Sequence, residues 1–186
     1  MKLQIKPFTL DLVPAAKEFT DISIGENYYT PTELIEAQKK SVASTGEITS
    51  FVLLDEHNRL QGIRLAYPPG NWTQGKSHKL RPELWPFPLE RAAYFQSLFI
   101  AEDTRGSGLG PQLSNRAIEI FKSLGALGIV THCWKESPNN SSFRYLEKMG
   151  FKPVIEYPDY WVDVQYTCTR DGYPCHCTAI EMVKTL

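Results

Sequence analysis

The chain has 186 residues, of which 42% are hydrophobic and 22% charged, and its formal net charge is −1. This length suits one hydrophobic core, so we expect a single domain over residues 1–186. The charge pattern lacks the basic footprint of a nucleic-acid-binding protein, and no nucleic-acid partner is expected. No apolar run reaches the length of a membrane span, and the lysines and proline of residues 2–7 rule against a secretory signal. We therefore expect a cytoplasmic protein with no membrane partner.

The first half of the chain predicts strands and helices in mixed order. Residues 3–8 alternate apolar and polar side chains, as a strand does. Asp11 is placed to begin one helix, and the run Thr30-Pro31-Thr32-Glu33 begins a second. Two apolar runs, 49–54 and 60–67, flank a polar turn and predict a hairpin.

The second half predicts an alternation of strands and helices. Its elements are a buried strand over 93–100, a helix over 109–124, a strand over 127–134, a helix from Ser137-Pro138 to Gly150, and a final strand pair over 160–168 and 175–184. Asp171-Gly172 marks the turn of that pair. This order predicts an α/β (α+β) protein whose mixed sheet is flanked by helices.

A long loop over about 68–90 interrupts this order. Its aromatic residues are Trp72, Trp85 and Phe87, and its basic residues are Lys76, His78, Lys79 and Arg81. One interpretation is a lid whose basic residues favour an acidic ligand. The other is an insertion whose tryptophans pack on the core. A loop of this length is typical of either.

A glycine-rich turn, Arg105-Gly106-Ser107-Gly108-Leu109-Gly110, joins a predicted strand to a predicted helix. Glycines let the backbone approach a ligand closely, and the first amides of a helix lack partners within it. Such a turn forms a nest for a phosphate or pyrophosphate. The glycine spacing fits neither a P-loop nor the dinucleotide fingerprint. The alternative is a turn that only connects strand to helix.

Three features follow one another between Leu98 and Phe151. They are the strand that runs into Arg105-x-x-Gly108-x-Gly110, the strand that ends at Trp134, and the run from Asn139 to Met149-Gly150-Phe151. In this order and spacing the segment resembles the GNAT superfamily of acyl-CoA N-acyltransferases. The resemblance implies a mostly antiparallel sheet in which the cofactor-binding strand splays from its neighbour.

The resemblance also implies acetyl-CoA as the acyl donor. Backbone groups of residues 98–100 would hold the pantetheine arm and the acetyl carbonyl, and the amides of the glycine turn would hold the pyrophosphate. The side chain of Asn139 would also contact the cofactor. The expected cofactor-binding residues are Leu98, Phe99, Ile100, Arg105, Gly106, Ser107, Gly108, Leu109, Gly110, Pro111 and Asn139.

The chain departs from the family where relatives keep their acid and base. A tyrosine that protonates the departing thiolate corresponds here to Leu146. Tyr145 is rotated from that position by about 100°, so we do not expect it to inherit the role. A glutamate that serves as base in some relatives corresponds to Trp134.

Three residues are therefore candidates for proton transfer. His132 is one, because the unperturbed pKa of a histidine suits base chemistry near neutral pH, although a strand histidine satisfied by hydrogen bonds is the competing interpretation. Glu136 is either a base or a solvated charge beside a helix start. Gln96, with Ser97, could position a water molecule on the strand that leads to the cofactor.

Three cysteines, Cys168, Cys175 and Cys177, gather near the last predicted turn. Zinc takes four ligands, and the paired Cys-x-x-Cys spacing is absent. We expect buried thiols and no metal, and the three cysteines stay candidate ligands whose fourth partner lies elsewhere or in another chain.

The function predicted from these features is transfer of an acetyl group from acetyl-CoA to an amine of a small molecule or peptide, by direct attack. The alternative is an acetyl-CoA-binding regulatory module with weak or no transfer, which the residues at positions 134 and 146 favour. A structural interaction domain would leave the glycine turn without a purpose. A homodimer is compatible with the sequence.

Overall fold

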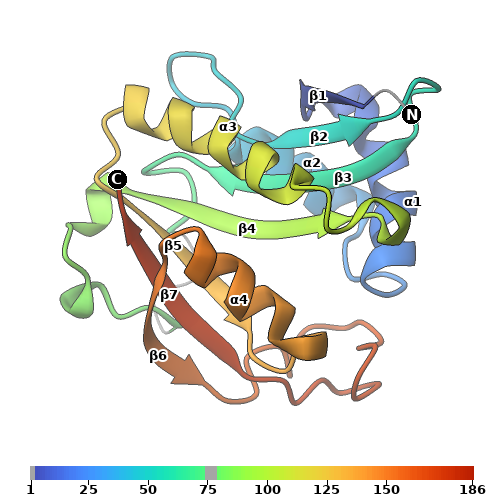
Figure 1. Ribbon diagram of the computed structural model, residues 1–186. Helices are drawn as coiled ribbons and strands as arrows, with labels where there is room; N and C mark the ends of the chain where they lie inside the picture. Colours follow the sequence, from blue (N-terminus) through green and yellow to red (C-terminus); the bar gives the residue numbers. More distant parts are fainter. Residues whose placement is uncertain (1–2, 74–78) are drawn as a thin grey trace.

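A seven-stranded sheet in the order β1-β2-β3-β4-β5-β7-β6 forms the centre of the protein (Figure 1). The structure is a computed structural model and describes residues 3–73 and 79–186. The strands are β1 (Gln4–Pro7), β2 (Phe51–Leu54), β3 (Leu60–Tyr67), β4 (Ala92–Ile100), β5 (Gly128–Trp134), β6 (Lys152–Tyr157) and β7 (Ala179–Thr185). Neighbouring strands are antiparallel except β4 and β5, which are parallel.

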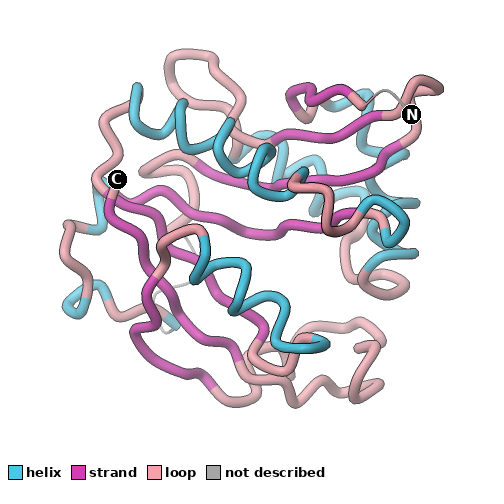
Figure 2. Tube along the Cα trace, viewed as in Figure 1, coloured by secondary structure: helices cyan, strands magenta, loops and turns pink. Residues whose placement is uncertain are grey.

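The α-helices of the described residues cover the two faces of this sheet (Figure 2). They are α1 (Val13–Ser23), α2 (Pro31–Lys40), α3 (Leu109–Ser123) and α4 (Ser141–Lys148). Side chains of α1 and α2 share one apolar cluster with Ile63 and Leu65, whereas those of α3 and α4 share the opposite cluster with Phe95. Successive strand residues point to opposite faces, so one sheet supplies both cores. The predicted mixed sheet flanked by helices is confirmed.

Local sequence signals begin α2 and end α3 and α4 as expected. The prediction that Asp11 begins the first helix is wrong, because α1 begins at Val13 with Leu12 as its N-cap and Asp11 lies in the 3-10 turn before it. At the start of α2, Thr30 and Glu33 form a reciprocal capping box. The Ser142 amide donates to Ser137 Oγ at 3.0 Å at the start of α4. Gly125 and Gly150 follow α3 and α4 with φ of 76° and 85°, the left-handed conformation that ends a helix.

The predicted final strand pair is wrong in its first member. Residues 160–168 lie in a loop, and the strand that pairs with β7 is β6, between α4 and that loop. Pro153 argues against a central strand, but β6 is the edge of the sheet, where a missing amide does no harm. The predicted turn is nevertheless present, since Cys168 and Gly172 exchange backbone hydrogen bonds of 2.9 Å in both directions.

The long segment that precedes β4 packs its aromatic side chains inward. Trp72, Trp85 and Phe87 expose only 1%, 8% and 5% of their surfaces. The indole of Trp72 donates to the carbonyl of Ala92 at 2.8 Å. These contacts agree with an insertion that packs on the core; Lys76 and His78 lie outside the described residues.

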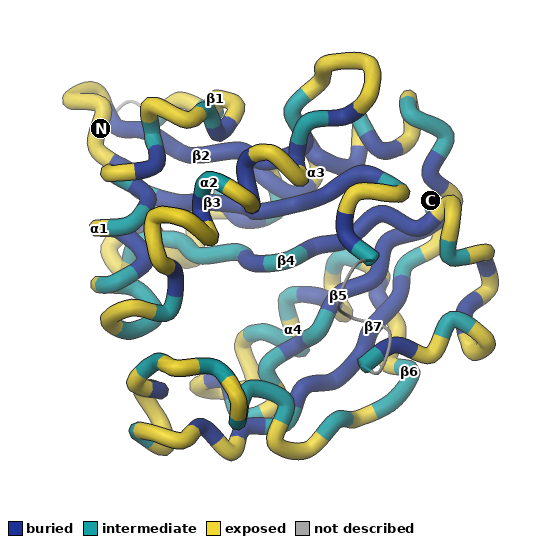
Figure 3. Tube along the Cα trace, turned by 180° about the vertical axis from the view of Figure 1, so that it is seen from behind, coloured by how far each residue is buried: buried dark blue, intermediate teal, exposed yellow. Residues whose placement is uncertain are grey.

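Burial is concentrated on the central strands, while the loops at the periphery are largely exposed (Figure 3). Within the two described segments, no helix has both the length and the apolar character that crossing a bilayer requires.

Candidate active site

The centre of the site is the point at which β4 and β5 part. The two strands pair in parallel over Ala92–Phe95 and Gly128–Thr131. Past that point β4 keeps its pairing with β3, and β5 keeps its pairing with β7. Gln96 is an extra residue in β4, because Leu65 opposes Ser97 while Ala66 opposes Phe95. A bulge bends its strand, and here β4 and β5 diverge into a fork, visible in Figure 1.

The edge of β4 that faces the fork carries alternate amides. Ala101 donates its amide to the carbonyl of Gln61 at 2.9 Å, which places Ala101 in a hydrogen-bonded pair with β3. Alternation along an antiparallel ladder then turns the amide of Phe99 toward β3, and those of Leu98 and Ile100 toward the fork. Of the three strand residues expected to bind the cofactor, Leu98 and Ile100 are the ones whose amides face the fork.

The glycine turn follows β4 and opens α3. Gly106 and Gly108 have φ of 79° and 78°, and a Cβ at either residue would meet no atom within 4 Å. Glycine is therefore required there by backbone conformation, and the space beside it is open. Within the described segments, the amides of Gly108, Leu109 and Gly110 donate no hydrogen bond. They point from the positive end of the α3 dipole, as an anion nest requires.

Gly110 is small for a different reason. A Cβ at this position would lie 3.2 Å from Leu98 Cδ2 and 3.6 Å from Tyr145 Cε2. The missing side chain therefore lets α3 approach both β4 and α4 closely. This contact holds the nest beside the open edge of the fork.

Three of the remaining residues of the expected cofactor set lie in or directly after the same turn, and Asn139 lies just before α4. Arg105 donates from Nε to the carbonyl of Ile100 at 3.1 Å, which ties the turn to the end of β4. Ser107 donates to the carbonyl of Thr104 at 2.5 Å, and Pro111 is in the first turn of α3. Asn139 is exposed just before α4, with φ of 55°.

His132 lies on β5, directly after the last residue that pairs with β4. Its side chain is 3% exposed. Nε2 lies 2.8 Å from the carbonyl of Lys79, and Nδ1 lies 2.8 Å from the hydroxyl of Tyr94. Because a carbonyl only accepts, Nε2 carries the proton and Nδ1 accepts from Tyr94. The histidine is thus buried and hydrogen-bonded at both nitrogens.

The sequence matches the family model described as the acetyltransferase (GNAT) family over residues 22–151. That match spans the fork, the glycine turn and α4. The chain belongs to the GNAT family. Acetyl-CoA is the cofactor of GNAT acetyltransferases.

Solved structures share this fold at low sequence identity. Ard1 from Thermoplasma volcanium is 14% identical with a TM-score of 0.70, covering 100% of this chain and 99% of its own. The NatC complex bound to Gag peptide and CoA is 15% identical with a TM-score of 0.71, and the match covers 100% of this chain and 99% of that chain. Arylalkylamine N-acetyltransferase 2 from Aedes aegypti is 14% identical with a TM-score of 0.64, and the match covers 100% of this chain and 99% of that chain. A search of curated sequences found no significant match.

Sequence reasoning missed a buried arginine next to the fork. Arg64 on β3 donates to Ser114 Oγ at 3.0 and 2.8 Å and to the hydroxyl of Tyr145 at 3.3 Å. Its guanidinium lies 4.1 Å from the ring centre of Phe95, and burial lowers its pKa. Its signal in the sequence is a single charge within the apolar run 60–67.

A buried carboxylate, Glu181 on β7, was also missed. It accepts from the indole of Trp85 at 2.7 Å and from Tyr157 at 3.1 Å, and lies 3.8 Å from His132 Nε2. Burial raises the pKa of Glu181. A charge among apolar residues of a predicted strand was its only sequence signal.

Tyr29 contacts β4 on the same face as His132. Its hydroxyl lies 2.6 Å from Ser97 Oγ, beside the bulge. Burial raises the pKa of Tyr29 to about 12, so the hydroxyl stays protonated at neutral pH. The Gln96 side chain also interacts with this hydroxyl.

The other sequence candidates lie farther along β5 and α4. Glu136 accepts the amide of Thr178 at 2.9 Å and lies 3.7 Å from Arg170, so it joins the end of β5 to the loop between β6 and β7. Leu146 is buried in the core cluster beneath α3 and α4. The hydroxyl of Tyr145 is bound to Ser114 and Arg64.

Proposed function

We propose that this GNAT protein is an N-acetyltransferase that moves the acetyl group of acetyl-CoA directly to an amine of a small molecule or peptide. The observation that carries the proposal is the fork at Gln96, with its open β4 edge aligned beside the anion nest of α3. A phosphate group in that nest and an extended arm along that edge match the two chemical parts of coenzyme A. The relatives named above acylate different acceptors by their names, so the acceptor of this chain stays open.

We assign the cofactor contacts as follows. The amides of Gly106–Gly110 bind the pyrophosphate, and those of Leu98 and Ile100 face the pantetheine arm and the thioester oxygen. The strand amide stabilises the oxyanion that forms when the amine attacks. The amine nitrogen bonds to the acetyl carbon, the carbon–sulfur bond breaks, and the thiolate takes a proton. Because Leu146 is buried and Tyr145 is hydrogen-bonded elsewhere, water is the proposed source of that proton.

The acceptor would enter from the face opposite α3 and α4. Aromatic side chains gather there: Tyr28 lies 4.9 Å from Tyr29 and 4.7 Å from Tyr166, between ring centres, and Tyr160 lies 4.7 Å from Trp161. Aromatic faces attract ammonium groups, which supports a cationic amine as the arriving substrate.

The amine must lose a proton before it attacks. We propose that His132 accepts this proton through the hydroxyl of Tyr94, which already donates to Nδ1. Glu181, 3.8 Å from Nε2, would stabilise the resulting imidazolium. Tyr160 lies over the imidazole at 4.7 Å between ring centres and covers it from solvent. Gln96 and Glu136 are secondary candidates, and Gln96 would position water beside the bulge.

The first test measures cofactor binding and turnover in the purified full chain. Acetyl-CoA at 100 times its Kd should stabilise the protein by about 2.7 kcal/mol, and a panel of amines should release free CoA. Gly108→Asp places a negative charge in the nest and should weaken acetyl-CoA binding about tenfold or more.

The matched control is Gly46→Asp. Gly46 has φ of 89°, and a Cβ there would meet no atom within 4 Å, so the substitution carries a similar backbone cost away from the site. Equal acetyl-CoA affinities of the two variants would show that the glycine turn does not bind the cofactor. Binding without CoA release from any amine would favour the regulatory alternative.

The second test concerns the proton route. His132→Asn should lower kcat and abolish the acidic limb of the pH–rate profile, because the group that titrates is gone. His57, exposed in the β2–β3 turn, provides the control variant His57→Asn. An unchanged pH–rate profile in His132→Asn would contradict the proposal that His132 accepts the proton.

The single domain over residues 1–186 is supported by the membership of β1 to β7 in one sheet. The cytoplasmic location, the possible homodimer and the absence of a nucleic-acid partner stay predictions.

A further inference from the structure

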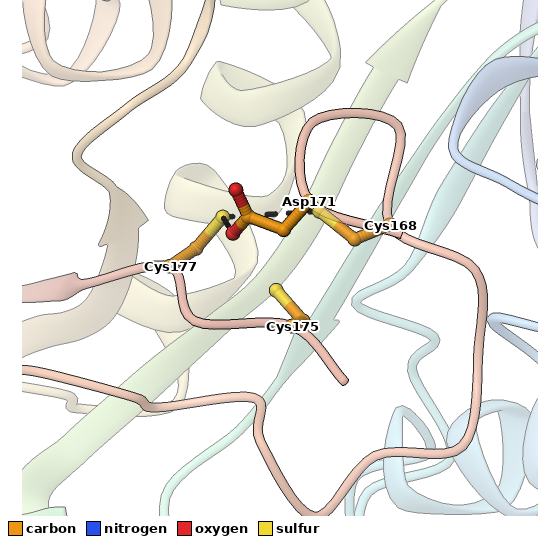
Figure 4. A group of neighbouring side chains, drawn as sticks. All are labelled: Cys168, Asp171, Cys175 and Cys177. Carbon is orange, nitrogen blue, oxygen red and sulfur yellow. Dashed lines mark hydrogen bonds between the residues drawn. The ribbon is translucent and has the colours of Figure 1, made fainter. Parts of the chain in front are cut away.

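Four side chains converge in the loop between β6 and β7. They are Cys168, Asp171, Cys175 and Cys177, and Figure 4 shows them turned toward a common centre. One donor atom from each lies within 4.8 Å of the donor atoms of the other three. The fourth partner that the cysteines lacked in the sequence is therefore a carboxylate from their own loop.

The separations fit a tetrahedral ion. Zinc–sulfur bonds of about 2.3 Å and zinc–oxygen bonds of about 2.0 Å place tetrahedral ligands about 3.8 Å apart for two sulfurs and about 3.5 Å for sulfur and oxygen. The Sγ atoms of Cys168 and Cys177 are 3.8 Å apart, and Cys177 Sγ lies 3.3 Å from Asp171 Oδ2. All three cysteines are free thiols, well beyond the disulfide distance of about 2.05 Å.

We propose that Cys168, Asp171, Cys175 and Cys177 form a structural zinc site that holds the β6–β7 loop. Three thiolates and one carboxylate complete a closed tetrahedron and leave no position open for substrate, as in structural zinc centres. Soft sulfur ligands favour zinc over magnesium, calcium and manganese.

The groups around this cluster are hydrogen-bond donors. Tyr166 donates to Cys175 Sγ at 3.2 Å, and the amide of His176 donates to Asp171 Oδ2 at 3.2 Å. Arg170 lies 3.9 Å from Cys177 Sγ. Donors of this kind orient metal ligands and balance the negative charge of thiolates.

Trp134 is a second, independent observation. Its indole nitrogen is the buried side-chain atom that finds no hydrogen-bond partner in the described parts of the chain. The ring packs against the three cysteines. A neutral thiol is a weak acceptor, whereas a metal-bound thiolate satisfies this donor.

The site would serve a long segment that lacks helices and strands. Residues 158–178 contain no α-helix or strand, and unstructured connections of this length are uncommon in compact domains. Closing a long loop with a metal offsets the conformational entropy of ordering it. The four residues of the cluster come from the second half of that loop.

The loop also borders the proposed acceptor surface. Tyr166 lies 4.7 Å from Tyr28 between ring centres, and a Cβ on Gly25 would meet the carbonyl oxygen of Thr167 at 2.6 Å. The metal would therefore hold one wall of that surface in place. This consequence rests on the proposed function, whereas the metal site itself does not.

The test uses the full chain purified under reducing conditions. Elemental analysis should find about one zinc per chain, and replacement by Co²⁺ should produce sulfur-to-cobalt charge-transfer bands and the visible bands of tetrahedral cobalt. A protein that holds no zinc and gives no such bands with Co²⁺ would overturn the proposal, as would a Cys168–Cys177 disulfide under the same conditions.

The variants separate ligand loss from general damage. Cys175→Ser should lose the bound zinc, and Asp171→Asn, at an exposed residue, should weaken zinc affinity about tenfold or more. Cys133→Ser is the matched control, because Cys133 is equally buried but contacts Ser142 on α4. Zinc retained by both ligand variants, or lost equally by the control, would contradict the assignment.

A final arm distinguishes the site from the proposed function. Chelation should lower the Tm of the wild type and leave acetyl-CoA affinity unchanged, since the nest lies at the start of α3. If an acceptor is found, chelation should raise its KM. If the protein binds zinc but has no transferase activity, the proposed metal site stands and only the proposed function is overturned.

Discussion

Glu181 illustrates how one buried residue can tie several elements together. It is fully buried on β7 and accepts hydrogen bonds from Trp85, Tyr157 and the amide of Arg81. A buried carboxylate is costly unless its oxygens are bonded, and these three donors offset that cost. Two of the donors come from the 68–90 segment, so the carboxylate anchors that segment to the sheet.

The raised pKa of Glu181 predicts a pH dependence of stability. Folding favours the protonated carboxyl, so its contribution is complete below the ordinary pKa of 4.5 and declines as pH rises through the folded value. In Glu181→Gln this ionisation is gone. The unfolding free energy of wild type minus variant should therefore fall as pH rises from about 4.5 to 8.

Urea denaturation across this range measures the difference. Glu119→Gln, on the exposed side of α3, is the control and should give a wild-type-minus-variant difference that changes less with pH. A Glu181→Gln difference that is constant with pH would show that the ionisation is not coupled to folding.

At the scale of elements, α3, α4 and β3 meet at a polar contact within an apolar core. Ser114 from α3 and Tyr145 from α4 lie 2.6 Å apart between hydroxyl oxygens, and both bind Arg64 from β3. The helices therefore share a buried cation, which fixes their positions more specifically than apolar packing alone. The same helices position the glycine turn, which includes Gly110.

Tyr145→Phe should lower the free energy of unfolding by about 1–3 kcal/mol, because Arg64 and Ser114 lose a buried partner. Urea denaturation provides the measurement. Tyr173→Phe, at a side chain that is 63% exposed, is the matched control and should be close to neutral. A loss no larger than that of the control would mean that solvent replaces the hydroxyl.

At the scale of the whole molecule, the sheet consists of two parts joined at a short parallel seam. In the described part of the chain, the strands β1 to β4 pair with the strands β5 to β7 only along Ala92–Phe95 and Gly128–Thr131. The proposed cofactor position lies beyond that seam, between the two parts. Binding there would add hydrogen bonds to β4 where β5 supplies none.

Amide hydrogen exchange followed by NMR tests this arrangement. Acetyl-CoA should slow exchange at Leu98 and Ile100, whose amides face the fork, and change Phe99 little, because its amide already faces β3. Coenzyme A without the acetyl group is the comparison ligand. Equal new protection at all three residues would contradict the assigned alternation.

Much of the element order followed from local signals. The sequence alone predicted the features that act over a few residues. These are the start of α2, the Ser137-Pro138 turn before α4, the glycines after α3 and α4, the alternation of β1 and the apolar runs of β2 to β5. The glycine turn and the Asn139–Phe151 run likewise indicated the family without knowledge of the fold. The prediction of the last strand pair was wrong because residues 160–168 have a strand-like pattern. Whether such a segment pairs with β7 depends on the fold, which places β6 at that position.

The sequence by itself therefore determined the order of most elements, the glycine turn before α3 and the GNAT family. Only the tertiary structure decided that the bulge falls at Gln96, that Glu181 lies beside His132, and that Asp171 joins the three cysteines. The physical reason is one of range. Caps and turns depend on neighbours within about four residues. These three contacts depend instead on how strands pair across the sheet and on how a loop folds, and no periodicity in the sequence records either.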